Sequence, residues 1–83
     1  MPTILFINGW RFFFYSNEGN EPIQIHVQKA ECEGKFWIIV ETLEIEVAYA
    51  YNFSSADIRA VKKLIYLNLD FIILKWNSIH GKK

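Results

Sequence analysis

The segment from Phe53 to Trp76 constrains the fold most, because it combines a helix start signal with helical periodicity. Ser54 is an N-cap residue with Asp57 three positions later, the spacing of a capping box. Phe53 and Ile58 have the spacing of a hydrophobic staple. Apolar residues then recur every three or four positions and predict a helical face that covers a sheet: Ile58, Val61, Ile65, Leu69, Ile72 and Trp76.

A second apolar stripe, formed by Leu64, Leu67, Phe71 and Leu74, lies on another side of the same segment. A helix that is apolar on every side must be buried on every side, which 83 residues cannot easily supply. Two explanations stay open. Either a partner covers the second stripe, or the helix breaks near residues 68–70 into a helical hairpin that buries both stripes, or both hold together. The alternating run LNLDFII leaves a strand as a third alternative.

The residues before this segment read as strands and turns. Asn8-Gly9 separates the apolar runs 3–7 and 10–15 and predicts a β-hairpin, since both turn residues must adopt positive φ. Run 10–15 carries aromatic residues on both faces, so we expect both faces to be covered. A polar loop over residues 16–22 follows.

Three further strands complete the predicted sheet. In the first, Ile23, Ile25 and Val27 alternate with a polar set, Gln24, His26 and Gln28, that we expect to face solvent. A turn over 29–34 holds Cys32 and leads to a strand over 35–40. The last strand, 43–47, has Glu44 and Glu46 on its wet side, and residues 49–52 bridge to the helix.

The predicted fold is therefore α+β in a single domain over residues 1–83. About five mainly antiparallel strands and their turns occupy residues 1–53, and a C-terminal helix or helical hairpin over residues 54–80 packs on the sheet.

Composition favours a folded, soluble protein, with 52% hydrophobic and 22% charged residues. The single cysteine, the lack of a basic segment before the first apolar run and the lack of an uncharged run of membrane-spanning length predict a cytoplasmic location. Residues 1–53 have a net charge of −4 and residues 54–83 a net charge of +4. These halves either pair with each other or leave the helix to bind an acidic partner.

Few residues suggest chemistry. His26 is a candidate acid/base and Arg11 a candidate phosphate holder for an RNA-directed enzyme, although a lone histidine on a strand is more often structural. Arg59, Lys62 and Lys63 are candidates for nucleic-acid contact, against which stands the neutral charge of the chain, with a pI near 6.7. No phosphate loop or metal-ligand spacing is present, so we expect no cofactor and no metal.

Several motifs, RFFFYSNEGNEP over residues 11–22, IHV over 25–27, KFW over 35–37 and KWN over 75–77, resemble a small bacterial family, domain of unknown function number 4160. The resemblance covers nearly the whole chain. It implies an α+β domain of strands followed by helical segments in a cytoplasmic bacterial protein. It also implies a neighbouring second small protein, an arrangement similar to toxin–antitoxin modules.

The chain departs from that family pattern twice. Gln24 stands where the first histidine of a His-x-His pair is usual, so a paired-histidine metal site or acid–base couple is in doubt. The run LNLDFIIL replaces a segment usually rich in Glu and Arg.

These observations lead to a first hypothesis and two alternatives. The first is a non-enzymatic interaction module that associates with itself or a small protein partner through Leu64, Leu67, Phe71 and Leu74. The alternatives are a toxin-like enzyme acting on RNA through His26 and a nucleic-acid-binding regulator.

Overall fold

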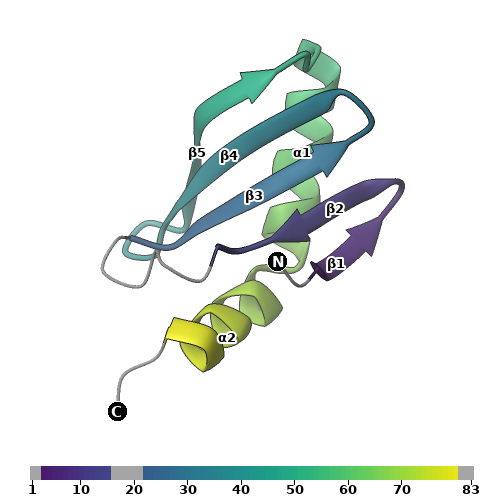
Figure 1. Cartoon of the computed structure of the whole chain (residues 1–83). Helices are drawn as coiled ribbons and strands as arrows, with labels where there is room; N and C mark the ends of the chain where they lie inside the picture. Colours follow the sequence, from purple (N-terminus) through teal and green to yellow (C-terminus); the bar gives the residue numbers. More distant parts are fainter. Residues whose placement is uncertain (1–2, 16–21, 81–83) are drawn as a thin grey trace.

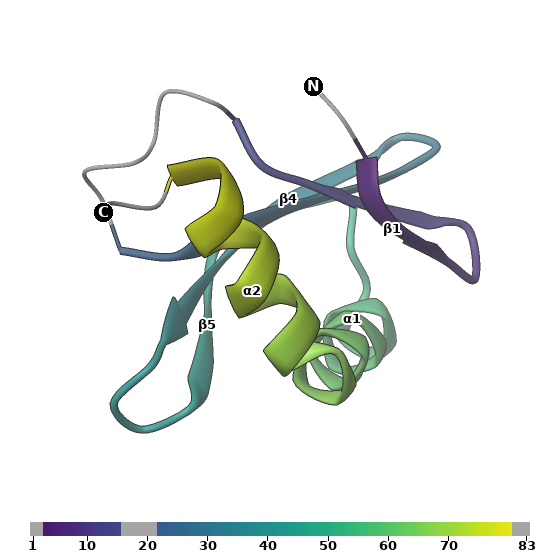
Figure 2. The same cartoon turned by 90° about the horizontal axis from the view of Figure 1, so that it is seen from below.

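The computed structural model describes residues 3–15 and 22–80, which form five strands followed by two helices. The strands are β1 (Thr3–Ile7), β2 (Trp10–Phe13), β3 (Gln24–Lys29), β4 (Cys32–Ile39) and β5 (Glu44–Tyr51), and the helices are α1 (Ser55–Leu67) and α2 (Leu69–His80). All neighbouring strands pair antiparallel in the order β1-β2-β3-β4-β5. Both helices lie on one side of this sheet (Figures 1 and 2). The predicted α+β fold is confirmed.

The hairpin turns follow local backbone chemistry. Asn8 and Gly9 have φ of 54° and 86°, so the predicted β1–β2 hairpin is confirmed. The β3–β4 turn is shorter than predicted, because Lys29 already pairs with Cys32 and the turn needs only residues 30 and 31. Ala30 adopts a φ of 52° there. Cys32 therefore begins a strand and does not lie in a turn. Most of the polar loop, residues 16–21, lies outside the described residues.

Strand β5 differs from its prediction at both ends. Leu43 adopts a φ of 59° in the preceding turn, so the strand begins at Glu44. It continues to Tyr51, through residues that were expected to bridge to the helix. A register shift between Lys35 and Phe36 in β4 accommodates this longer pairing.

The start of α1 is confirmed in detail. The Asp57 N–H donates to Ser54 Oγ at 3.0 Å, and the Ser54 N–H donates to Asp57 Oδ2 at 3.1 Å, which completes a capping box. The preceding Phe53 stacks on Trp10, with ring centroids 5.1 Å apart. Helix α1 is thus fixed to the sheet at its first turn.

The helical segment breaks at Asn68, as the prediction of a break near residues 68–70 stated. Asn68 Nδ2 donates to the Leu64 carbonyl oxygen at 2.8 Å, while the Asn68 carbonyl accepts from the Ile72 N–H at 2.9 Å. One residue therefore ends α1 and supports the first turn of α2. The alternative of a strand over residues 67–73 is wrong.

The core lies between the sheet and the helices. The predicted helical face supplies Val61, Ile65, Leu69, Ile72 and Trp76, all buried, with Ile58 partly buried beside them. The sheet supplies Trp10, Phe12, Ile25, Val27, Phe36 and Ile38, and Phe14 joins them from just after β2. In the described part of the chain, neither helix has the length and apolar character needed to cross a membrane.

Candidate functional site

Exposed apolar side chains gather where α1 meets α2. We call these residues the apolar surface: Leu43, Tyr66, Leu67, Phe71 and Leu74. The side chains of Leu67 and Leu74 are 67% and 65% exposed, and that of Phe71 is 38% exposed. An open hollow of about 410 Å³ is lined by Leu43 and residues 66–71, so the β4–β5 turn and both helices contribute to one site.

Three of the four interface residues predicted from the sequence belong to this surface. The fourth, Leu64, is half-buried and packs against the core. The break at Asn68 therefore does not bury the second stripe, which was one of the two explanations offered for it. Leu43 and Tyr66 were missed, because nothing in the local sequence places the β4–β5 turn beside the helix junction.

Charged residues border the apolar surface. Asp70 lies in the first turn of α2 and lines the hollow. Lys75 Nζ lies 5.7 Å from the centroid of the Phe71 ring, within cation–π range.

The predicted basic candidates all lie on α1. Arg59 and Lys63 are exposed, and Lys62 is half-buried. Their spacing of three and four residues places them along one face of the helix. A second open hollow, of about 660 Å³, lies around the β4–β5 end of the sheet and is lined by Pro22, Ile23, residues 37–41 and Glu46.

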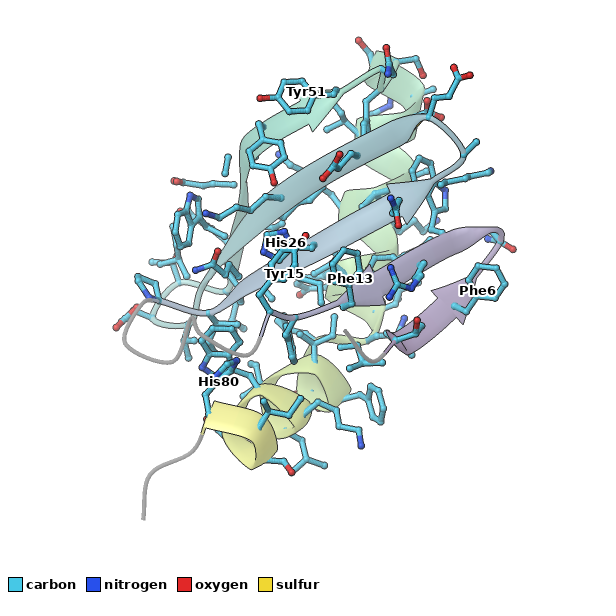
Figure 3. The ribbon with its side chains drawn as sticks, in the orientation of Figure 1. Phe6, Phe13, Tyr15, His26, Tyr51 and His80 are labelled. Atoms are coloured by element: carbon cyan, nitrogen blue, oxygen red, sulfur yellow. The ribbon has the colours of Figure 1, made fainter. Side chains whose placement is uncertain are left out.

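The sheet face turned away from the helices carries a cluster of stacked rings (Figure 3). His26 pairs with Phe13 across β2 and β3, and their ring centroids are 5.5 Å apart at an interplanar angle of 25°. Tyr15 meets the imidazole edge-on at 4.3 Å. The Arg11 guanidinium carbon lies 4.3 Å from the Phe13 centroid, and its Nε donates to Thr3 Oγ1 at 2.6 Å.

This cluster corrects the prediction that the polar residues of β3 face solvent. His26 is only 5% exposed and Gln24 is fully buried, whereas Gln28 is exposed as expected. The rings of Phe13 and Tyr15 cover the imidazole from the neighbouring strand and the segment that follows it. Arg11 and His26, the candidate catalytic pair, do lie on one face, but in a setting that resembles a small second core.

The described residues also bear on metal binding. Within residues 3–15 and 22–80, no group of three or more His, Cys, Asp and Glu side chains is arranged to hold a metal ion.

Fold and surface together define a class of protein: a small α+β domain with a five-stranded antiparallel meander, two helices on one face and an exposed apolar junction between those helices. Residues 9–77 match the family described as Domain of unknown function (DUF4160), and the chain belongs to this family. The match includes both helices up to Asn77 and hence the whole apolar surface. No curated protein and no solved structure matches the chain.

Proposed function

We propose that this protein is a non-enzymatic interaction module that binds another protein chain through the apolar surface. The observation that carries the proposal is the grouping of Leu67 and Phe71 around a hollow that Leu43 and Tyr66 complete, with Leu74 exposed one turn further along α2. Isolated apolar residues on a surface are ordinary, but a contiguous patch rimmed by charges is typical of a protein interface.

The energy available to a partner is appreciable. Full burial of a leucine side chain is worth about 1.5–3 kcal/mol. Leu67 and Leu74 are each about two-thirds exposed, so covering them contributes roughly 1–2 kcal/mol apiece. Neither side chain belongs to the buried core, to which the same helical segment contributes Ile65, Leu69 and Ile72. Contact with another molecule therefore explains the exposure of Leu67 and Leu74 better than a role in folding does.

The geometry favours this function over catalysis at His26. General acid/base chemistry requires the imidazole to reach the atom whose proton it transfers. The ring is 5% exposed and lies in contact with the rings of Phe13 and Tyr15. Packing accounts for this arrangement directly.

Photo-crosslinking in living host cells tests the proposal. A benzophenone amino acid replaces Leu74 in one variant and Phe6 in a matched control. Phe6 is 71% exposed and lies on β1, at the far edge of the sheet from β5, so it presents a large apolar side chain outside the apolar surface. We expect a discrete protein–protein product from position 74 and none from position 6.

A second substitution in the variant with the probe at position 74 provides a check. Leu67→Glu, added elsewhere in the apolar surface while the probe stays at position 74, should abolish the product, because a buried carboxylate without a partner is costly. Absence of any product from position 74, or equal products from positions 74 and 6, would show that the apolar surface is not a docking site.

A further inference from the structure

The exposed side of α2 carries a pattern that is complementary to itself. Phe71 and Leu74 of α2 lie three residues apart, the spacing of neighbouring seam positions in paired helices, and Leu67 lies before the break, at the end of α1. Asp70 immediately precedes Phe71, and Lys75 immediately follows Leu74. At about 100° per residue, these two charges flank the seam on opposite sides.

A parallel arrangement of two such helices brings opposite charges together. Asp70, which precedes the seam residue Phe71, then faces the residue five positions later on the other helix. That residue is Lys75, so Asp70 of each copy meets Lys75 of the other. In an antiparallel arrangement, Asp70 of one copy faces Asp70 of the other, and Lys75 faces Lys75. Neither residue then has an oppositely charged partner. Within residues 3–15 and 22–80, neither Asp70 nor Lys75 has an ion-pair partner, so both charges are available for contact across an interface.

We propose that the partner of the apolar surface is a second copy of this chain, with α2 packed in parallel against α2 about a two-fold axis. This inference rests on the proposed function and names its partner. The seam contains Phe71 and Leu74 of α2, and two Asp70–Lys75 pairs close its sides. Lys75 is already held at the rim of the seam, over the Phe71 ring.

The charges at the rim favour a second copy over an acidic partner. The net charge of +4 on residues 54–83 is attractive to an acidic surface as a whole. The seam itself is bordered by one acid and one base, and a uniformly acidic partner would repel Asp70. Because α2 has 12 residues and is about 18 Å long, the interface is small, and we expect dissociation in the micromolar range.

Charge exchange tests the pairing by sedimentation equilibrium, from low micromolar to millimolar concentration. Asp70→Lys places two lysines on each side of the seam and Lys75→Asp places two aspartates there, so each variant alone should dissociate about tenfold more readily, as two attractive pairs become repulsive. An equimolar mixture of these two variants, and the double variant D70K/K75D, should recover the wild-type association. Arg59→Asp is the control, because it makes the same charge change at an exposed position of α1 two turns from Leu67.

A wild-type chain that stays monomeric at every concentration overturns the inference. Single variants that associate as strongly as the wild type also overturn it, as does an equimolar mixture that fails to recover wild-type association. Lys75→Asp alone remains informative if Asp70→Lys does not fold. The crosslinking experiment separates the two proposals. A product from position 74 with a different protein, and none of twice the chain mass, overturns pairing with a second copy but retains the interaction module. No product overturns both.

Discussion

Gly34→Ala tests how the helices are attached to the sheet. Gly34 is buried in β4, and an added Cβ would lie 3.0 Å from Phe53 Cζ and 3.2 Å from Phe36 Cε1. Neither ring can easily give way, because Phe53 is stacked on Trp10 and Phe36 is fully buried. Overpacking of this kind costs about 1–3 kcal/mol. We expect the free energy of unfolding to fall by that amount and Tm to fall by roughly 5–20 °C.

Urea denaturation followed by circular dichroism measures this loss, and a double-mutant cycle identifies its cause. Phe53→Leu shortens the side chain that meets the new methyl group. The pair Gly34→Ala with Phe53→Leu should therefore lose less stability than the two single variants added together, by about 0.5 kcal/mol or more. A Gly34→Ala variant within about 0.5 kcal/mol of the wild type, or strictly additive losses, would refute this account of the contact.

Three further outcomes are expected from the same denaturation assay. Ser54→Ala removes the capping box and should cost about 1 kcal/mol, whereas Ser54→Asp should retain most of the stability; equal losses would contradict the cap. Ile65→Ala should cost about 2–5 kcal/mol because the side chain is fully buried, while Leu67→Ala in the same helix should stay within about 0.5 kcal/mol when the chain is monomeric. His26→Ala should lower stability by roughly 1 kcal/mol or more because it removes the ring contacts with Phe13 and Tyr15, and His26→Phe should lower it less; the reverse order would argue against a packing role.

The fold was largely readable from the sequence because its main signals are local. The capping box at Ser54 needs only residues 54–57, and the buried helical face needs only the spacing of apolar residues. The hairpin at Asn8 likewise depends on two adjacent residues that tolerate positive φ. Each of these features is decided within a few residues of itself.

The site was only partly readable, because its members come from different parts of the chain. Burial of His26 depends on Phe13 and Tyr15, which lie on and just after another strand, and alternation along β3 alone assigns it to solvent. The local sequence around Asn68 allowed a continuous helix, a break or a strand, and the side-chain hydrogen bond to the Leu64 carbonyl marks the break. The inclusion of Leu43 in the apolar surface depends on where the β4–β5 turn is placed.

The strand order of the meander bears on how the chain folds during synthesis. Among the five described strands, each is bonded only to strands adjacent in sequence, so successive hairpins can form as the ribosome releases them. The helices that shield the inner side of those hairpins emerge after all five strands. A nascent chain that stops short of Ser54 would leave Phe12 and Phe36 exposed to water, so synthesis of residues 54–80 decides whether the product stays soluble or aggregates.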